Sequence, residues 1–432
     1  MGQYQAGLAR VTITPPVGMY LIGMERMDVS HGLRDDLFAT ALAVSNGVIE
    51  TVIVSLDVLV IHPKTVERIR QIASALTGIP GENIMFCATH CHSGPIMYSF
   101  EDSQPMVRGY MENFTHLVIG LIRMAHDNLA PVRLGFGRGE SAIGMNRRLT
   151  RPDGVTVIDA NPQGPVDHEV GILRVDRLDG SPLAVVVNYA CHPVVLGSIS
   201  NVISADWVGA MRRAVEKITG AKLLFIQGAS ADINPWPGVP TDDESVLERL
   251  GLEIGGEVLK IWPSIPLEEQ GEVQAACRKV WLPLLPLSEY AGKLPEFVEL
   301  AGAVADLTFD QLQAWLHEFM PWSTELAGEG DDTKAALEMQ CLRIGDLGLV
   351  SAGAEIFVKT GLEVKQRSPF TNTAFAAYTN GALSYIPLPE DYPRGGYEVF
   401  EAYLGYGLPA PVAPQGANLI VENAIALLQE VA

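Results

Sequence analysis

The segment Ala88-Thr89-His90-Cys91-His92-Ser93-Gly94-Pro95 follows a short apolar run, residues 83–87, that is typical of a buried strand. The Gly-Pro pair then ends the run. If strand geometry continues through the histidines, His90 and His92 lie on one face and Cys91 on the other, because side chains alternate along a strand. Two imidazoles on one face suit a single metal ion or a single anionic group. A pair of hydrogen-bonded loop histidines is the alternative that this short motif leaves open.

The composition is that of a well-buried globular protein. The 432 residues are 48% hydrophobic and 19% charged, whereas disordered chains have few hydrophobic and many charged residues. The formal net charge of −21 argues against nucleic acid or an anionic membrane surface as the main partner, because both require a basic footprint. A small-molecule substrate is therefore the expected partner, and so apolar a chain leaves a homo-oligomer open.

The cysteines and the N-terminus predict the compartment. The five cysteines have no regular spacing, which favours a reducing environment over a disulfide framework. The first residues contain no basic region followed by an apolar stretch, and the apolar stretch 49–61 is interrupted by Glu50 and Asp57. We therefore expect a cytoplasmic protein without a secretion signal and without stable membrane insertion.

Strand and helix patterns alternate along the whole chain. Residues 37–45 and 48–58 predict a β-hairpin around Asn46-Gly47, a strongly favoured turn. Further strands are expected at 6–13, 83–87, 132–137, 169–175, 183–190, 222–227, 272–284 and 373–379. Helices are expected at 63–76, 106–128, 206–218, 244–262, 288–319, 355–365 and 417–430. This interleaving predicts one α/β domain over residues 1–432, with a mixed β-sheet flanked by helices.

A second histidine follows another apolar strand in the segment Asn188-Tyr189-Ala190-Cys191-His192-Pro193. The order is the same as before: an apolar run, a histidine at its end, and a proline that stops it. Polar residues at strand ends are where α/β proteins place their chemistry. Alone, His192 suits a capped loop histidine, but together with His90 and His92 it is a candidate third imidazole.

The segment Gly228-Ala229-Ser230-Ala231-Asp232-Ile233-Asn234-Pro235 directly follows the predicted strand 222–227. Its small residues let the backbone approach a ligand. Asp232 and Asn234 share a face if the segment is extended. An Asx turn closed by Asn-Pro is the structural alternative.

The C-terminal part of the chain supplies a glutamate and two tyrosines. Glu355 is expected at the start of a helix, where a carboxylate can serve as a cap alone. Tyr385 and Tyr397 lie in a segment rich in glycine, proline and tyrosine, 380–414. Tyrosines in such a loop are by default packing anchors.

Taken in order, these motifs resemble the neutral/alkaline ceramidase family, which are zinc amidohydrolases. The likeness extends from Thr12-Ile13-Thr14-Pro15-Pro16 to Tyr397. It implies an α/β catalytic domain that holds one zinc ion and hydrolyses a linear amide. Matched by motif, the implied zinc ligands are His90, His192, Glu355 and Tyr385, and the implied catalytic residues near the scissile amide are His92, Tyr397 and Arg147. Gly94 and Asp232, from the same motifs, are predicted to bind substrate.

Two departures from the family pattern change what the resemblance implies. Asn234 stands where the family has the serine often assigned as nucleophile. A serine nucleophile at this position is therefore excluded, a water nucleophile on the metal becomes the economical mechanism, and Asn234 is itself a candidate catalytic residue. The chain also ends near the end of the family's catalytic domain, so we expect no C-terminal immunoglobulin-like domain. Because ceramide meets proteins at membranes, the predicted substrate is an N-acyl amide other than ceramide.

The donor set agrees with zinc on chemical grounds. Two imidazoles, one carboxylate and one further oxygen are ligands that Zn²⁺ accepts. Zinc lowers the pKa of a bound water towards about 7. The tetrahedral oxyanion that follows attack would be stabilised by hydrogen bonds from His92, Tyr397 or Arg147.

Two other functions are left open. Asp57, Asp206 and Asp232 lie near predicted strand or helix ends and would build a carboxylate-rich second metal site in a metal-dependent esterase or phosphatase. Alternatively, the asparagine in place of the family serine suggests a metal-bearing binding protein that has lost catalysis. Residues 95–105 and 288–332 are expected to shape the mouth of the pocket.

Overall fold

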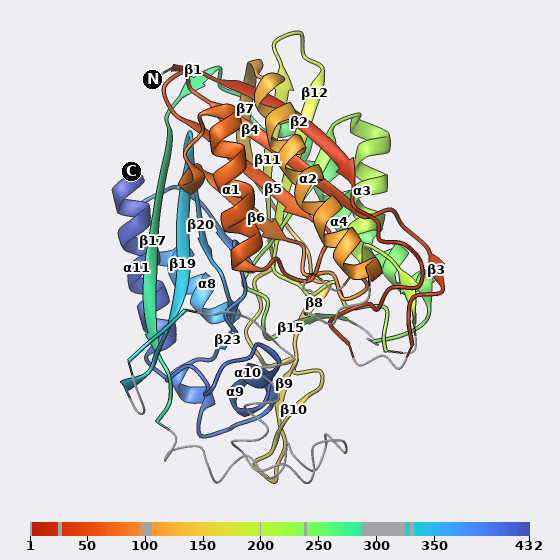
Figure 1. Cartoon of the computed structure of the whole chain (residues 1–432), viewed down its shortest axis with the longest axis vertical. Helices are drawn as coiled ribbons and strands as arrows, with labels where there is room; N and C mark the ends of the chain where they lie inside the picture. The colour runs from red at the N-terminus through yellow and green to blue at the C-terminus, as the bar shows by residue number, and fades with distance from the viewer. Residues whose placement is uncertain are drawn as a thin grey trace.

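An eight-stranded mixed sheet forms the centre of the molecule (Figure 1), in a computed structural model that describes residues 2–24, 28–95, 97, 105–198, 200–236, 240–286, 325–328 and 332–432. The strand order is β14-β12-β11-β7-β2-β4-β5-β6. The strands are β2 (Gln5–Thr12), β4 (Phe38–Ser45), β5 (Glu50–Leu56), β6 (Ile84–Ala88), β7 (Ala130–Glu140), β11 (Glu169–Arg177), β12 (Pro182–Tyr189) and β14 (Lys222–Gln227). The pairs β5–β6 and β12–β14 are parallel and the other neighbours are antiparallel. The predicted mixed α/β fold is thus confirmed, and β4 and β5 form the predicted hairpin around Asn46-Gly47.

Four helices cover one face of this sheet, two over each half. They are α1 (Pro63–Thr77), α2 (Pro105–Asp127), α3 (Asp206–Thr219) and α4 (Glu244–Ile261). Helices α1 and α2 pack on β2, β4 and β5, and lie in front of these strands in Figure 1. Helices α3 and α4 pack on β11, β12 and β14 through a separate apolar cluster. Each helix buries an apolar stripe here, as its sequence periodicity predicts.

A second, five-stranded sheet packs on the opposite face, and the sequence did not predict it. It contains β17 (Val273–Pro283), β18 (Leu326–Ala327), β19 (Lys334–Ile344), β20 (Leu347–Ala352) and β22 (Asn372–Ala376). One apolar cluster joins the two sheets, for example Leu42 and Ile53 with Leu342 and Leu349. Helices α8 (Val358–Arg367) and α11 (Gly416–Val431) lie on the outer side of the second sheet. The result is a layered arrangement of helices, two sheets and helices again.

The first and last strands in the order of the large sheet approach each other. Strand β14 contacts β5 and β6, and the Ser55 hydroxyl joins them. Its oxygen donates a hydrogen bond to the carbonyl of Phe225 (2.7 Å) and accepts one from the same residue's N–H (3.3 Å). The segment after β22 then links the strand ends, because the Ala377 N–H donates to Gln227 and the Ala88 N–H donates to Tyr378. The ends of β6, β14 and β22 therefore meet in one place.

The described part of the chain also contains five pairs of short strands, several of which lie below the large sheet in Figure 1. The pairs are β1 (Gly2–Gln3) with β16 (Gln270–Gly271), β3 (Gly32–Leu33) with β13 (Val202–Ile203), β8 (Gly144–Asn146) with β15 (Ile233–Pro235), β9 (Arg148–Thr150) with β10 (Thr156–Ile158), and β21 (Glu355–Ile356) with β23 (Tyr385–Ile386). The short helices α9 (Tyr397–Phe400) and α10 (Ala402–Gly405) follow β23. Strands β8, β15 and β23 lie beneath the lower ends of the long strands, where the predicted site residues are.

Two local predictions were wrong. The strand ends at Ala88, and His90 has a positive φ of 62°, so His90 and His92 do not alternate as strand residues. A non-glycine residue in this backbone region costs on the order of 1–3 kcal/mol, which surrounding contacts must offset. Glu355 is not at a helix start: it lies in β21, and α8 begins at Val358. The predicted helix over 288–319 lies outside the described residues, as does most of the loop 95–105.

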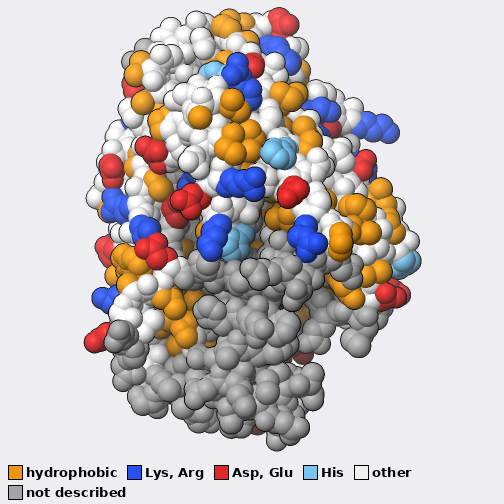
Figure 2. Space-filling model, viewed as in Figure 1, with side chains coloured by type: hydrophobic (Ala, Val, Ile, Leu, Met, Phe, Trp, Pro, Cys, Tyr) orange, Lys and Arg blue, Asp and Glu red, His pale blue; other side chains and the backbone are white. Residues whose placement is uncertain are grey.

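The described surface carries mixed charge. On the face shown in Figure 2, Lys and Arg side chains lie among Asp and Glu side chains instead of forming one continuous basic area. Within the described ranges, none of the helices combines the length and apolar character needed to cross a bilayer.

Candidate metal centre

Four chain segments bring polar side chains together beneath the strand ends. His90 follows β6, His192 follows β12, and the segment containing Asp232 follows β14. Glu355 enters from β21, beyond the end of the second sheet. The site therefore draws on both sheets, which explains why its residues are so far apart in the sequence.

The three histidines form a compact buried cluster. The ring centroid of His90 lies 4.8 Å from that of His92 and 4.8 Å from that of His192. Their ligand nitrogens lie within 4.8 Å of one another, and this is the cluster of potential metal ligands found among the described residues. The strand alternation that was expected to align His90 and His92 is absent, but the positive φ of His90 turns the two rings towards each other.

Backbone carbonyls fix the tautomer of these rings. The Nδ1 atom of His90 lies 2.9 Å from the carbonyl oxygen of Leu59, and Nδ1 of His192 lies 2.8 Å from that of Ser230. His92 has the same arrangement towards Gly23, at 2.9 Å. A carbonyl only accepts, so each Nδ1 carries the proton and each neutral ring has its lone pair on Nε2, as in histidines that ligate metals.

The lone pairs of two of these histidines face a carboxylate. Glu355 Oε1 lies 3.3 Å from Nε2 of His90, and Glu355 Oε2 lies 3.7 Å from Nε2 of His192. These two Nε2 atoms are buried without a hydrogen-bond partner in the described part of the chain. Burial, with Arg147 and the two other histidines nearby, lowers the pKa of His192 well below its usual value, so this ring is neutral. A lone pair that faces a carboxylate oxygen is repulsive unless a cation lies between them.

The spacing also fits zinc. Two ligands that each lie about 2.1 Å from a tetrahedral zinc ion are about 3.4 Å apart. The separations between Glu355 and the two imidazoles, 3.3 and 3.7 Å, are close to this value. The residues present therefore suit the metal that the sequence resemblance implies.

The pairing of two short strands places Glu355 beside Tyr385. Strands β21 and β23 are parallel, with Glu355 opposite Tyr385 in the register. Burial by itself would raise the pKa of Glu355, whereas the hydrogen bond from Tyr406 and the charge of Arg147 lower it. Glu355 is therefore ionised at neutral pH, although it is almost completely buried.

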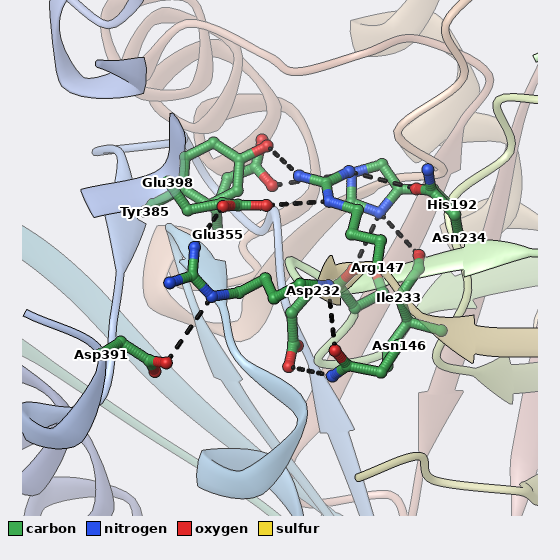
Figure 3. A network of polar contacts seen from close by, with 12 residues as sticks. Asn146, Arg147, His192, Asp232, Ile233, Asn234, Glu355, Tyr385, Asp391 and Glu398 are labelled. Atoms are coloured by element: carbon green, nitrogen blue, oxygen red, sulfur yellow. Dashed lines mark hydrogen bonds and ion pairs between the residues drawn. The ribbon is translucent and has the colours of Figure 1, made fainter. Parts of the chain in front are cut away.

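Arg147 connects the tyrosine to the neighbouring polar groups (Figure 3). Its guanidinium donates to Tyr385 Oη (3.0 Å), to Glu398 Oε1 (3.0 Å) and to Asn234 Oδ1 (3.1 Å). Burial opposes the charge of Arg147, but Tyr385, Glu398 and Glu355 outweigh it and raise its pKa well above the usual value. Arg147 is therefore a fixed positive charge that orients Tyr385 and Asn234.

Asp232 belongs to the wall of the site. Its carboxylate accepts hydrogen bonds from Asn146 Nδ2 (2.9 Å) and from the backbone N–H of Val358 (2.8 Å), as Figure 3 shows for Asn146. Burial raises the pKa of Asp232 to about 7. The carboxylate thus joins β8 to the start of α8.

Tyr397 lies at the edge of the site. Its ring stands edge-on against Tyr385, with the centroids 5.8 Å apart, and 39% of the residue is exposed. Burial of the hydroxyl and the charge of Glu355 raise its pKa, so the phenol keeps its proton. Among the predicted site residues it therefore combines an available proton with access from solvent.

Comparison with known proteins identifies the family of the chain. The family described as "Neutral/alkaline non-lysosomal ceramidase, N-terminal" matches residues 4–228, more than half of the chain. The chain belongs to the neutral/alkaline non-lysosomal ceramidase family. The resemblance inferred from the order of the motifs is confirmed.

Individual members of the ceramidase family share low sequence identity with this chain and are matched over only part of their length. The chain is 24% identical to the neutral ceramidase of Pseudomonas aeruginosa over 404 residues, which cover 78% of this chain and 58% of that protein. Neutral ceramidase B of Dictyostelium discoideum is 26% identical over 184 residues, 37% of this chain and 24% of that protein. The chain thus spans little more than half the length of the Pseudomonas relative.

Solved ceramidase structures share the fold. A ceramidase solved in complex with C2 superposes with a TM-score of 0.76 at 21% identity, covering 99% of this chain and 75% of that one. The crystal structure of the neutral ceramidase from Pseudomonas aeruginosa gives a TM-score of 0.75 over all of this chain and 75% of that one, also at 21% identity. These superpositions confirm the predicted ceramidase-like α/β fold.

Most of the residues predicted from the ceramidase motifs are neighbours in space. His90, His92, His192 and Glu355 form the centre, and Arg147, Tyr385, Tyr397 and Asn234 adjoin it. Gly94 is buried, and its carbonyl accepts a hydrogen bond from the Ile22 N–H (3.1 Å). Their individual roles stay predictions.

Sequence reasoning missed two tyrosines that contact Glu355. The Tyr378 hydroxyl donates to Glu355 Oε2 (3.0 Å), and the Tyr406 hydroxyl donates to Glu355 Oε1. Burial and the charge of Glu355 raise the pKa of both phenols well above the usual value, so both are protonated donors. Neither tyrosine belongs to one of the motifs described above. The high number of tyrosines in the C-terminal part of the chain was the available signal.

The carboxylate-rich second metal site is not formed. Asp57 is paired with Arg212 at 2.6 and 2.7 Å. Asp206 accepts from the backbone N–H groups of Leu196 and Trp207, and Asp232 has the partners given above. Among the described residues these three aspartates form no common metal cluster, because each carboxylate accepts hydrogen bonds from a separate set of donors.

Proposed function

We propose that this chain is a zinc-dependent hydrolase that cleaves a linear N-acyl amide bond by means of an activated water, with a substrate other than ceramide. The observation that carries the proposal is the arrangement of His90, His192 and Glu355. Two Nε2 lone pairs, fixed by hydrogen bonds on the other ring nitrogen, face an ionised carboxylate at distances that suit zinc ligands.

The proposed zinc ligands are His90, His192, Glu355 and Tyr385. When bound there, zinc would supply a Lewis acid for the substrate carbonyl and would lower the pKa of water at the site. The remaining steps depend on residues of the chain itself.

Arg147, Tyr397 and His92 would act on the substrate side. Arg147 holds Tyr385 in place and adds a fixed positive charge next to the developing oxyanion. Tyr397 is partly exposed as a residue, and its buried, protonated hydroxyl would donate to the same oxygen. His92 donates from Nδ1 to Gly23, so Nε2 is the atom at which it would accept a proton and return it to the leaving amine.

The structure also supports a positioning role for Asn234. Its side-chain oxygen accepts from Arg147 (3.1 Å), so it completes the set of acceptors around this guanidinium. An amide is no nucleophile, which is why the proposal uses water. For the donors to the oxyanion proposed above, Arg147 and Tyr397, removing one such hydrogen bond typically costs about 3 kcal/mol in the barrier.

The choice of a substrate other than ceramide rests on charge. The net charge of −21 disfavours binding to the anionic membrane surfaces where such lipids are found. The relatives named as ceramidases are matched over little more than half of their length or less, so their substrate is not transferred to this chain.

A substrate panel tests the proposal. Zinc-loaded and chelator-treated protein would be assayed on N-acyl amides of several acyl lengths and amine parts, on ceramide in detergent micelles, and on aryl acyl esters and aryl phosphates. We expect zinc-dependent hydrolysis, with kcat/KM on the best N-acyl amide at least about tenfold above that on ceramide, a difference of about 1.4 kcal/mol in the barrier.

Each other outcome contradicts a different part of the proposal. Fastest turnover of ceramide would overturn the substrate, and turnover of phosphates alone would overturn the reaction class. A protein that binds zinc and hydrolyses none of the amides or esters would be the binding protein considered above. His126→Ala serves as the matched control, because His126 is a partly buried histidine paired with Glu50 outside the site.

A further inference from the structure

Both oxygens of Glu355 are held by tyrosines that none of the motifs described above contains. Tyr378 donates to Oε2 (3.0 Å), and Tyr406 donates to Oε1. We propose that Tyr378 and Tyr406 form a clamp that positions the Glu355 carboxylate and thereby sets the affinity of the metal centre. The inference rests on the proposed function, because it assumes that Glu355 is a metal ligand.

Ring stacking and two backbone hydrogen bonds hold Tyr378 in the metal centre. Its ring stacks on that of His90, with the centroids 3.9 Å apart and the planes inclined by 23°. Its backbone carbonyl accepts from the Ala88 N–H at the end of β6, and its N–H donates to Ala354, next to Glu355. Tyr378 thus touches one predicted ligand with its ring and another with its hydroxyl.

The direction of the hydrogen bonds around Tyr378 is fixed by chemistry. An ionised carboxylate can only accept, so the phenolic proton of Tyr378 points to Glu355. The 3.2 Å contact with Ser230 Oγ must then be donated by the serine. Ser230 also accepts from His192 Nδ1 through its carbonyl, so a continuous set of hydrogen bonds joins His192, Ser230, Tyr378 and Glu355.

Tyr378 has an unusual backbone conformation. Its φ is 57°, and this region is rarely occupied by aromatic residues. Residues held in this way cluster at functional sites, where the surrounding contacts determine them. His90, on which Tyr378 stacks, shares the positive φ, so the two stacked rings both depend on a backbone that is fixed on either side of them.

Tyr406 approaches Glu355 from the C-terminal segment. It follows α10, and its ring stands edge-on to Tyr385 with the centroids 6.2 Å apart. It therefore contacts the carboxylate from the side of the proposed tyrosine ligand, whereas Tyr378 contacts it from the side of the histidines. Two donors from different segments oppose rotation of the carboxylate more effectively than one.

The clamp leaves the carboxylate able to bind a cation. Each carboxylate oxygen has two lone pairs, and a phenol uses one of them. Partners that orient a metal ligand in this way typically change metal affinity by about 10- to 100-fold when they are removed. The hydroxyl groups are the active part, so Tyr→Phe variants, which keep the rings, isolate the effect.

The test is the zinc dissociation constant, measured by competition with a chromophoric chelator. The proteins are the parent, Tyr378→Phe, Tyr406→Phe and the double variant, with Tyr392→Phe as the matched control. Tyr392 is a buried tyrosine of the same segment whose hydroxyl donates to the Val412 carbonyl, away from the centre. We expect the Kd to rise by about tenfold or more in each single variant. We expect a larger rise in the double variant and a change of less than about twofold in Tyr392→Phe.

Urea unfolding of the metal-free proteins separates a positioning role from a structural one. A purely structural role would lower the stability of the metal-free variants and leave the Kd of the folded protein unchanged. Zinc binding by the parent, with unchanged Kd in Tyr378→Phe and in Tyr406→Phe, would therefore overturn the clamp and leave the proposed function standing. A parent protein that binds no zinc would overturn both.

Discussion

Two buried carboxylates at strand ends, Asp57 after β5 and Glu355 in β21, have opposite surroundings. Both oxygens of Asp57 accept from the guanidinium of Arg212 at 2.6 and 2.7 Å, and Oδ2 also accepts from the Phe38 N–H. The oxygens of Glu355 instead face imidazole nitrogens and two phenols. A carboxylate paired with a built-in cation serves the fold, whereas one surrounded by neutral ligand groups suits a cation from solution.

The largest expected effect is the loss of zinc binding at the centre that contains Glu355. His192→Ala removes one lone pair that faces the carboxylate, and we expect zinc content to fall from about one ion per chain to near zero. Elemental analysis of the purified proteins measures this directly. His126→Ala should keep the parental zinc content. Equal zinc in parent and His192→Ala would show that the histidine cluster is not the metal site.

A second variant removes the ion pair between Asp57 and Arg212. Arg212→Met leaves a buried carboxylate without its counter-charge, which typically costs about 3–5 kcal/mol. We expect urea unfolding to show this loss while the folded protein still binds about one zinc ion. Arg367→Met, which removes exposed ion pairs with Glu363 and Glu422, should leave the free energy of unfolding nearly unchanged. A small loss in Arg212→Met would mean that water or a neighbour replaces the guanidinium, and that the contrast between the two carboxylates is weaker than the geometry indicates.

The smallest expected effect is a pH dependence of the stability of the metal-free protein, caused by His192 in the same centre. The pKa of folded His192 lies well below its usual value, so below about pH 6.5 the unfolded chain binds a proton that the folded chain does not. The stability of the metal-free protein should therefore fall as the pH decreases from about 6.5, by up to about 1.4 kcal/mol per pH unit from this residue. Urea unfolding of the parent and of His192→Asn at several pH values measures the difference in slope. Identical slopes would contradict a neutral, buried His192.

The parts of the fold that depend on local pattern were predicted well. The Asn46-Gly47 turn between two apolar runs predicted β4 and β5, and β14 was predicted with its observed ends, Lys222 and Gln227. These elements are determined by neighbouring residues in the chain. The second sheet was not predicted, because alternation along β17 and β19 indicates strands but not which sheet they join.

The site was predicted by the order of its motifs, and its fine structure was not. The motifs grouped His90, His192 and Glu355, which are distant in sequence, and the structure brings them close together. The positive φ of His90 has no signal in the sequence, because it is imposed by contacts made after β6 ends. Tyr378 and Tyr406 were missed for the same reason: a tyrosine becomes a partner of Glu355 only through the tertiary fold.

The Ser55 hydroxyl that joins β5 to β14 has a consequence for the folding pathway. It bonds to a residue 170 positions away in the sequence, and the proposed ligands His90 after β6, His192 after β12 and Glu355 in β21 come together only once such contacts exist. Closing long loops is entropically costly and slows folding. In small zinc modules metal binding supplies the folding free energy, and the chain is unfolded without the metal. Here the order is reversed: the chain must fold first, and we expect refolding to proceed at the same rate in the presence of a chelator, with zinc captured as the last event.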